Sequence, residues 1–375
     1  MAILLANAVM AIAQVNVASV YLSISVTFDE QITGLGILTA LLFVGLGLAE
    51  IPGGLLSSRT GPKKVTLAAI ATVALASLAS GYSPSFDALL ILRFFVGVGL
   101  GLFFPSMVVL AIRSTSKGAS GMGVGLVGVS GSLGGGLGTL SWSVLGAVYG
   151  WRTSLFLDAS LTAAVGVLVF LMVPSDQRSA TSSLSLSDFR EIIARKKLVM
   201  LCLCLFGIGA SGSLIGNFMV YYLEKDFGIQ PGYAGFITAI GWLSLIFGSL
   251  LGGRLYDKGS HTGLLIFAST AAYGVSTIIV GVHSLYAATL GAVAWGFTGG
   301  MCGTAAIAAA KKLAPDAHLE ALTIGMCDSF SLLGNFASGL YFPLLVLSLG
   351  YPLGWAIGGS VCIFLALPLV LFKDM

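Results

Sequence analysis

Residues 87–112 read DALLILRFFVGVGLGLFFPSMVVLAI, and this stretch decides the class of fold. After its first residue it contains a single ionisable side chain, Arg93. It is long enough to cross a bilayer, because a helix of about 20 apolar residues spans about 30 Å of hydrocarbon. Apolar stretches of similar length fill most of the chain on either side. We therefore expect a helical membrane protein.

The amino-acid composition supports this interpretation. Hydrophobic residues make up 57% of the 375 residues and charged residues 9%, with a mean hydropathy of +1.01. A soluble chain usually carries about 25% charged residues, so this one could not cover a water-exposed surface with polar groups. Gly is abundant at 51 residues, and in an apolar chain such an excess favours close helix contacts in lipid. No sizeable soluble domain is expected.

Clusters of charge, Pro and Gly divide the chain into twelve apolar segments. The first six are expected at 3–24, 33–57, 65–82, 87–112, 119–148 and 152–173. The second six are expected at 197–222, 232–256, 262–282, 284–311, 319–347 and 351–372. The first segment lacks the basic start of a signal peptide and is interpreted as a helix, with a truncated N-terminus left open. The prediction is an all-α membrane protein of about twelve transmembrane helices, with an N-terminal six-helix bundle at 1–173, a cytoplasmic linker at 174–196 and a C-terminal six-helix bundle at 197–375.

The basic residues predict the orientation in the membrane. If the polar stretch at 174–196 faces the cytoplasm, 15 of the 18 lysines and arginines lie on that side. Only Arg152 and Lys225 lie on the opposite side, and Arg93 lies within a helix. Cytoplasmic loops of membrane proteins carry such an excess of positive charge. We therefore expect a multi-pass protein of the plasma membrane with both termini in the cytoplasm.

The two halves of the chain resemble each other. IPGGLLSSRTGPKK at 51–64 corresponds to LLGGRLYDKGSHTG at 250–263, and Gly134 corresponds to Gly334. Six spans per repeat return the chain to the side from which it started. The sequence therefore predicts parallel repeats about an axis along the membrane normal, an arrangement that serves alternating access.

Four motifs, in the same order along the chain, carry a resemblance to a known family. They are GLLSSRTGPKK at 54–64, RFFVGVGLG at 93–101, GWR at 150–152 and GGRLYDK at 252–258. They resemble signatures of the major facilitator superfamily, although Ser58 stands where the family usually has Asp and Val96 where it has Gln. The resemblance covers nearly the whole chain. It implies two six-helix bundles that rock around a substrate site near the membrane midplane.

The same resemblance implies a gating role for the two loop motifs. Arg59 and Asp257 could pair with facing helix ends and stabilise the outward-facing state. Plain anchoring by basic residues on the cytoplasmic side is the alternative, and it stays open. The candidate gating residues are Gly54, Arg59, Gly61, Lys63, Gly253, Asp257 and Lys258.

The fifth segment contains a glycine-rich run, GMGVGLVGVSGSLGGGLG at 121–138. Its G-x-G-x-x-G string matches a dinucleotide fingerprint, but that fingerprint needs a preceding strand, which does not fit here. Repeated G-x-x-x-G spacing instead predicts close helix packing at Gly131, Gly134, Gly135 and Gly138. A glycine-rich fifth helix with a Gly-Pro pair accompanies antiporters in the family, and this run has no Pro.

Four ionisable side chains stand out inside the predicted spans, away from the span ends: Glu50, Arg93, Asp158 and Asp328. Such groups are costly in hydrocarbon and usually mark an ion or substrate pathway. Desolvation favours the protonated form of a carboxyl, as a proton-coupling group requires. Asp328 and Glu50 are the candidate proton carriers, whereas Asp158 is interpreted as structural, within reach of Arg152 or the outer interface.

Polar side chains on neighbouring segments could line a substrate cavity. In the family, the first, fourth, seventh and tenth helices line this cavity. The resemblance therefore implies Asn16, Arg93, Asn217 and Trp295 as cavity residues. Asp328 and Asn335 are seven residues apart and so share a helix face. The candidate cavity residues are Asn16, Arg93, Asn217, Tyr221, Trp295 and Asn335.

These features predict a secondary transporter of a small solute, coupled to protons by alternating access. Uptake of a small organic metabolite or anion is expected, and efflux of drugs or other hydrophobic compounds by proton antiport is the alternative. The single Arg93 favours an anion, whereas the two buried acids favour a proton or cation. A sensor or channel built on the same fold also remains open. The expected partners are a small-molecule substrate, protons and the lipid bilayer, for a monomer.

Other functional classes find little support. The chain has no H-E-x-x-H string, no evident Ser–His pair and no G-x-x-x-x-G-K-[ST] nucleotide loop, so neither an enzyme nor an ATP-driven pump is expected. The five cysteines all lie in apolar stretches and are interpreted as small core residues, not as a metal site. No cofactor, metal or nucleic-acid partner is predicted.

Overall fold

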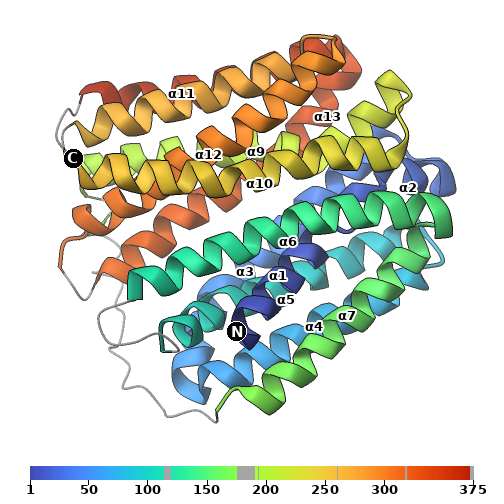
Figure 1. Ribbon diagram of the computed structural model, residues 1–375, viewed down its shortest axis with the longest axis horizontal. Coiled ribbons are helices and arrows are strands. Elements are labelled where there is room, and N and C mark those ends of the chain that lie inside the picture. The colour runs from blue at the N-terminus through green and yellow to red at the C-terminus, as the bar shows by residue number, and fades with distance from the viewer. Residues whose placement is uncertain (114–119, 175–190, 193, 260, 317–318, 372–375) are drawn as a thin grey trace. The chain divides into compact units, whose positions relative to one another are not determined.

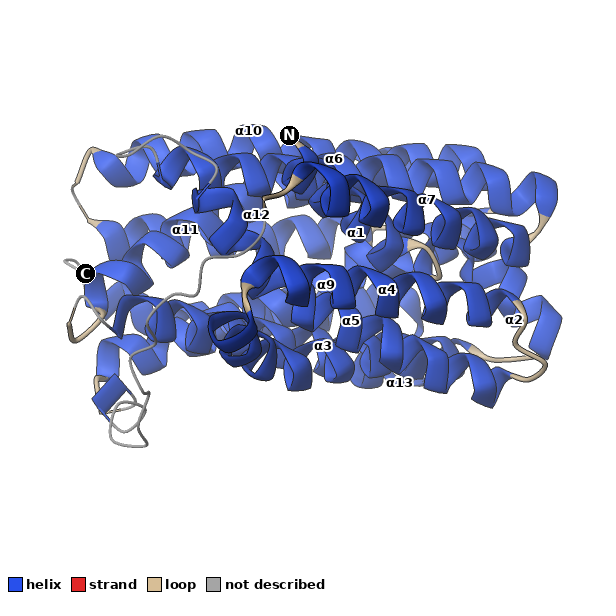
Figure 2. Ribbon diagram, turned by 90° about the horizontal axis from the view of Figure 1, so that it is seen from below, coloured by secondary structure: helices blue, strands red, loops and turns tan. Residues whose placement is uncertain are grey.

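The computed structural model describes residues 1–113, 120–174, 191–192, 194–259, 261–316 and 319–371. Every described element is a helix or a loop (Figure 1, Figure 2), so the all-α prediction is confirmed. Most of the predicted linker, residues 175–190 and 193, lies outside the described residues.

The helices follow the predicted segments closely. The first six segments correspond to α1 (Ala2–Val15) with η1 (Ala18–Val20) and α2 (Tyr21–Phe28), α3 (Ile32–Thr60), α4 (Pro62–Gly81), α5 (Phe86–Arg113), α6 (Ser120–Tyr149) and α7 (Trp151–Met172). The second six correspond to α9 (Lys196–Phe227), α10 (Pro231–Asp257), α11 (Thr262–Val280), α12 (Leu285–Leu313) and α13 (Glu320–Ala366), followed by η3 (Leu367–Leu371).

Most of the described helices are long enough to span a bilayer. Nine of their helices are long and apolar enough to cross a bilayer, and ten if the bent pair α1 and α2 counts as one span. The long helix α13 covers the last two predicted spans. Gly350, with a φ of 80°, separates them. Helix α6, with 30 residues, corresponds to the fifth predicted segment, 119–148.

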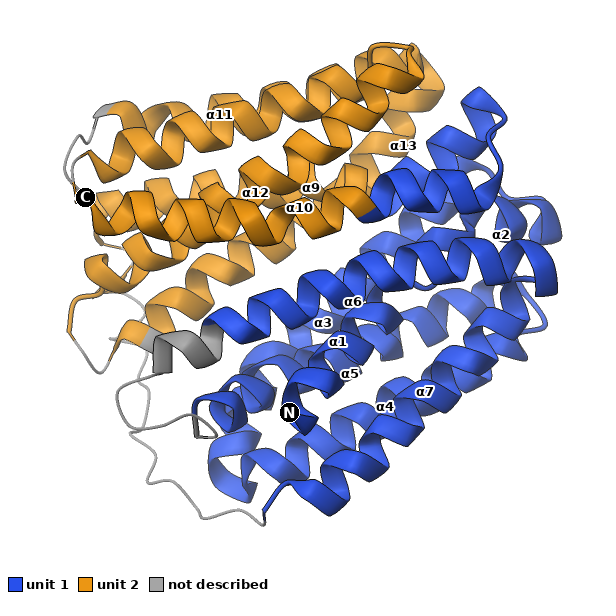
Figure 3. Ribbon diagram, viewed as in Figure 1, with its two compact units in different colours: residues 1–181, 217–239 blue, residues 182–216, 240–375 orange. Residues whose placement is uncertain are grey.

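The described chain forms two compact units, coloured separately in Figure 3. Unit 1 contains residues 1–181 and 217–239, and unit 2 contains residues 182–216 and 240–375. In unit 1, α3 packs on α5, α4 packs on α5 and α7, and α1 packs on α6 and α7. In unit 2, α11 packs on α12 and α13. The bundle boundaries predicted from the sequence stay a prediction.

The first span is broken, which the sequence analysis did not foresee. Helix α1 ends at Val15, and the segment Ala18–Phe28 continues at an angle of 42° to it. The break contains Asn16 and the β-branched Val17. An Asn side chain offers the backbone an alternative hydrogen-bond partner, and β-branched residues are less favourable in helices.

Glycine allows backbone-to-backbone packing at the same places in both units. A Cβ added at Gly97 of α5 would overlap the carbonyl oxygen of Leu42 in α3, and one at Gly300 of α12 would overlap that of Leu245 in α10. From 97 to 300 and from 42 to 245 the offset is identical. The same offset relates the pair Gly45 and Phe94 to the pair Gly248 and Phe297. Both units therefore contain one crossing geometry, as a duplicated sequence requires.

Candidate functional site

The break in the first span leaves backbone carbonyls that need donors. In an unbroken helix, the carbonyls of residues 13–15 would accept hydrogen bonds from the N–H groups of residues 17–19. Here the Val17 N–H donates to the Asn16 side chain over 2.6 Å, and the Ser19 hydroxyl donates to the Val15 carbonyl over 2.8 Å. Side chains thus take over hydrogen bonds of the backbone at this point.

Arg93 of α5 donates to the end of α1. Its guanidinium donates to the Gln14 carbonyl over 2.6 Å and to the Ala13 carbonyl over 3.5 Å. A positive charge is favourable there, because the C-terminal end of a helix carries partial negative charge. Only 2% of Arg93 is exposed, so this cation lies wholly inside unit 1.

Asn16 connects Arg93 to Asp158 of α7. The Asn16 side-chain oxygen accepts from Arg93 over 2.9 Å, and its side-chain nitrogen donates to Asp158 Oδ2 over 2.8 Å. Both Asn16 and Asp158 are buried, with 1% and 0% of their surface exposed. The amide therefore bridges two opposite charges, and we call Asp158, Asn16 and Arg93 the buried relay.

The expected partner of Asp158 was wrong. Arg152 lies over the rings of Phe28 and Trp151 and donates to the Ser83 carbonyl over 3.2 Å. The sequence does hold a signal for the buried position of Asp158, because Ser154, Asp158 and Thr162 repeat at four-residue spacing. In the structure all three are fully buried. Polar residues at this spacing form a stripe along one helix face, and that stripe faces the protein interior.

In unit 2, the predicted cavity residue Trp295 lies in an aromatic cluster with two residues that the sequence analysis missed. Trp295 stands edge-on to Trp242 of α10 at 5.5 Å between ring centroids, and it stacks on Tyr273 of α11 at 6.2 Å. Gly212 of α9 leaves room for the Tyr273 hydroxyl. Among the described residues, neither indole N–H donates a hydrogen bond of normal geometry, although the Trp295 indole lies near the Tyr273 hydroxyl.

The other predicted cavity and proton-coupling residues lie on α9, α13 and α3. Asn217 is half-buried and Tyr221 is buried, both on α9, and Asn335 on α13 donates to the Ser331 carbonyl of its own helix over 2.9 Å. Asp328 on α13 and Glu50 on α3 are half-buried. None of these residues belongs to the buried relay.

The first loop motif is tied to the end of α7. The Lys63 ammonium donates to the carbonyls of Phe170, over 2.9 Å, and Val173. Gly61, with a φ of 104°, makes the turn between α3 and α4 that brings Lys63 there. Lys63 thus caps a helix end of its own unit, which is an anchoring contact.

The other gating candidates lie near helix ends. Gly54 and Gly253 are half-buried, while Arg59, Asp257 and Lys258 are exposed and make no ion pair within the described part of the chain. The gating interpretation therefore stays a prediction.

The glycine-rich helix α6 packs closely on α1. A Cβ added at Gly134 would overlap the Ala8 carbonyl, and one at Gly138 would lie 2.9 Å from Ile12 Cα. Gly131 has more room, with the nearest atom, Asn7 Nδ2, at 3.4 Å. Gly135 is buried on the same helix.

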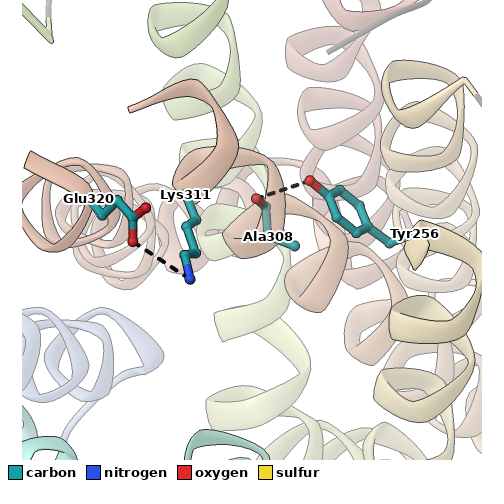
Figure 4. Close-up of polar contacts among 4 residues, drawn as sticks. All are labelled: Tyr256, Ala308, Lys311 and Glu320. Atoms are coloured by element: carbon teal, nitrogen blue, oxygen red, sulfur yellow. Dashed lines mark hydrogen bonds and ion pairs between the residues drawn. The ribbon is translucent and has the colours of Figure 1, made fainter. Parts of the chain in front are cut away.

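A cavity of about 570 Å³ lies at the ends of α10, α12 and α13 in unit 2. Its lining includes Tyr256, whose hydroxyl donates to the Ala308 carbonyl over 3.1 Å, and the ion pair of Lys311 with Glu320 at 3.6 Å (Figure 4). The pair is well exposed, and an exposed ion pair contributes about 0–1 kcal/mol. The cavity lies at helix ends, away from the aromatic cluster. The described residues also contain no cluster of three His, Cys, Asp or Glu side chains that could hold a metal ion.

Comparison with known proteins matches this architecture to a transporter family. Residues 3–214 and 201–375 match the sequence profile of the Major Facilitator Superfamily. The 3-(3-hydroxy-phenyl)propionate transporter of Escherichia coli is 25% identical over 306 residues, covering 79% of this chain and 74% of that one. A probable sugar efflux transporter of Mannheimia succiniciproducens is 25% identical over 303 residues, covering 78% and 73%.

Two further likenesses are informative. A 4-hydroxybenzoate transporter of Pseudomonas aeruginosa is 30% identical over 144 residues, covering 38% of this chain and 32% of the relative. The crystal structure of a D-xylose–proton symporter superposes with a TM-score of 0.82 at 14% identity, covering 100% of this chain and 97% of the other. At 14% identity, this superposition shows a shared fold and no more.

Proposed function

The chain belongs to the major facilitator superfamily and is a transporter of small solutes, and from this premise we propose that it takes up a small aromatic carboxylate together with protons. The solute would be moved by alternating access, as the duplicated architecture predicts. The proposal concerns the class of solute, the coupling ion and the direction.

The aromatic cluster of unit 2 is the observation that carries the solute class. Trp295 is 4% exposed, and among the described residues neither its indole N–H nor that of Trp242 donates a hydrogen bond of normal geometry, although the Trp295 indole lies near the Tyr273 hydroxyl. A buried donor without an acceptor is unfavourable. Aromatic side chains bind planar rings by stacking and edge-to-face contacts, and an indole N–H can donate to a carboxylate. A solute with a ring and a carboxylate would meet both requirements.

Two relatives support the same class. The names of the Escherichia coli and Pseudomonas aeruginosa proteins both give an aromatic hydroxy acid as the solute. Arg93 is an intramembrane cation whose counter-charge inside unit 1 is Asp158, and an anionic solute would compete with that carboxylate for it. Asn16, Asn217, Tyr221 and Asn335 remain candidates for further contacts in the cavity.

Proton coupling is proposed from the carboxyls inside the spans. Asp328 lies eight residues after the start of α13 at Glu320, and Glu50 lies ten residues before the end of α3 at Thr60, so both fall inside the spans. The loop motifs with Arg59 and Asp257 would stabilise one of the two alternating states. In this proposal the protein works as a monomer in the plasma membrane, with both termini in the cytoplasm.

The test is solute-driven proton flux into proteoliposomes that contain a pH-sensitive dye. Labelled 4-hydroxybenzoate or 3-(3-hydroxyphenyl)propionate is added outside, and internal pH and label are followed together. Protein-free liposomes set the baseline, because the neutral form of such acids crosses lipid unaided. Asp328→Asn and Glu50→Gln are measured beside wild type, with Asp87→Asn, an exposed acid at the start of α5, as the matched control.

We expect protein-dependent acidification that accompanies label uptake and is lost in Asp328→Asn or Glu50→Gln but not in Asp87→Asn. Uptake of label without a pH change would refute proton coupling. The absence of uptake for both acids would refute the solute class.

Export by proton antiport is the second candidate, because one relative is a probable sugar efflux transporter. It predicts the opposite dependence on the gradient. Solute would leave vesicles when the destination compartment is acidic, and an inward proton gradient would not drive uptake.

A further inference from the structure

Asp158 has one carboxylate oxygen that no described residue satisfies. Its Oδ2 accepts from Asn16, whereas its Oδ1 is buried and accepts no hydrogen bond from the described chain. The Nε of Arg93 is also buried without a hydrogen bond among these residues. Buried polar atoms in native proteins are nearly always paired, so an unpaired one requires an explanation.

The surroundings of Asp158 contain one other fixed charge. Helix α4 presents the Ser77 hydroxyl, which lies near Asp158 without a hydrogen bond of normal geometry. Helix α1 presents Asn16, and residues 125–148 of α6 contain no ionisable side chain. Helix α5 presents Arg93, which interacts electrostatically with Asp158 and with Tyr21 of α2. Arg93 is thus the only fixed charge facing this carboxylate from the described elements packed around it.

We propose that Asp158 binds a coupled proton on Oδ1, and that Asn16 transmits the resulting change in charge to Arg93 and to the break in the first span. The proposal deepens the proposed function, on which it rests, by naming a coupling residue that the sequence analysis had assigned to structure. It stands beside the candidates Asp328 and Glu50, and it is tested separately from them.

The chemistry is a simple protonation. A proton from the water on one side of the membrane forms an O–H bond with Oδ1 and later leaves to the other side, and no other bond changes. The new hydroxyl becomes a donor, and the nearby Ser77 oxygen can accept from it. The unsatisfied oxygen seen in the unprotonated geometry thus gains a partner.

Protonation also removes the counter-charge of Arg93. With Asp158 ionised, the buried relay is neutral overall, which lowers its cost inside hydrocarbon. With Asp158 protonated, Arg93 becomes a buried cation without a compensating anion, and an anionic solute can take that role. Proton binding and anion binding then favour each other by the same factor, because linkage is reciprocal.

The break in the first span gives this change a structural effect. Arg93 donates to the carbonyls of Ala13 and Gln14 at the end of α1, and Asn16 accepts from the Val17 N–H. Any shift of Arg93 toward a solute anion would weaken these contacts. Transporter sites commonly use such interrupted helices, where exposed backbone groups meet charged ligands.

The first test needs no solute. Infrared difference spectra of the full-length protein in liposomes, recorded from about pH 5 to about pH 9, show carboxyls that exchange protons near neutral pH. We expect a titrating protonated-carboxyl band that is missing in Asp158→Asn and retained in Asp87→Asn. An unchanged band in Asp158→Asn would overturn the proposal, whatever the transport results are.

The second test uses labelled 4-hydroxybenzoate. In Asp158→Asn, exchange between equal pools on both sides should persist, while accumulation driven by a pH gradient should be lost. A double variant with Asn16→Asp and Asp158→Asn moves the carboxylate next to Arg93 and keeps a donor–acceptor pair at the same two positions. It should regain gradient-driven accumulation.

A purely structural role predicts a different pattern. Exchange and accumulation would then fall together in Asp158→Asn, and the double variant would rescue neither, which would overturn the inference. If wild type moves no 4-hydroxybenzoate although the Asp158 band titrates, the proposed solute class fails and the proton site stands.

Discussion

Replacing Gly97 by Ala tests the backbone packing of α3 on α5. The added Cβ would overlap the Leu42 carbonyl oxygen and would lie 2.9 Å from its carbonyl carbon. The contact of the Cβ with that oxygen would be closer still, whereas ordinary contacts are 3.4–4 Å, so the two helices would have to separate by about 1.3 Å or more. The neighbouring atoms belong to a helix backbone, which cannot swing aside as a flexible side chain can.

The expected cost follows from two opposing terms. Overpacking of this kind costs about 1–3 kcal/mol, whereas Ala is favoured over Gly in a helix by up to about 1 kcal/mol. We therefore expect Gly97→Ala to lower the free energy of unfolding by about 1–2 kcal/mol. With about 2–4 °C per kcal/mol, the thermal midpoint should fall by about 2–8 °C.

The assay is thermal unfolding in detergent, followed by tryptophan fluorescence. Gly300→Ala in α12 should show the same loss, because its Cβ would overlap the Leu245 carbonyl in the duplicated crossing. Gly47→Ala in α3 and Gly303→Ala in α12 are matched controls, since an added Cβ at either position meets nothing within 4 Å. If Gly97→Ala and Gly300→Ala are as stable as these controls, the packing argument is refuted.

Three further predictions follow from contacts inside single units. Trp295→Phe removes the indole donor and should weaken binding of 4-hydroxybenzoate about fivefold to tenfold, the loss of one hydrogen bond of about 1 kcal/mol, whereas Trp355→Phe should leave the apparent affinity of uptake unchanged. Copper phenanthroline should link Cys202 to Cys327, whose sulfurs lie 3.5 Å apart; a peptide map without this cross-link would contradict the packing of α9 on α13. Lys63→Met should lower the thermal midpoint by a few degrees, because the carbonyls of Phe170 and Val173 lose a charged donor worth about 1.5–3 kcal/mol. Equal stability of the variant and wild type would show that water replaces the ammonium there.

The sequence predicted the helices well because membrane spans follow from simple physics. A bilayer requires about 20 apolar residues per helix, and backbone groups must be paired within it. The twelve predicted segments accordingly agree with the observed helices to within a few residues at most ends. Even the interruption between the last two segments was predicted, because Gly350 and Pro352 mark it.

The buried relay was harder to predict because its partners are remote in sequence. Asp158 and Asn16 are on the last and first spans of the N-terminal half, and Arg93 is on the fourth. Sequence spacing reveals neighbours on one helix but not which helices meet. Asn16 and Arg93 were selected by resemblance, whereas Asp158 was assigned to the nearest cation along the chain, Arg152, which lies against aromatic rings instead.

The aromatic cluster shows the same limit from another side. Trp295 was selected as a cavity residue, but Trp242 and Tyr273 were not. The signal lay in glycines on other helices, since Gly212 and Gly299 leave the space that the Tyr273 ring fills. The absence of a side chain at Gly212 and Gly299 could be interpreted only after the structure placed Tyr273 beside them.

The glycine crossings also have a mechanical consequence. Where two helices touch backbone to backbone, no deformable layer of side chains separates them. We therefore expect α3 with α5, and α10 with α12, to move as rigid helix pairs. A helix of 29 residues such as α3 is about 43 Å long. If such a helix pair tilts by about 10° about one end, the other end moves by about 7.5 Å. Displacements at a loop would thus reach the opposite membrane face undiminished.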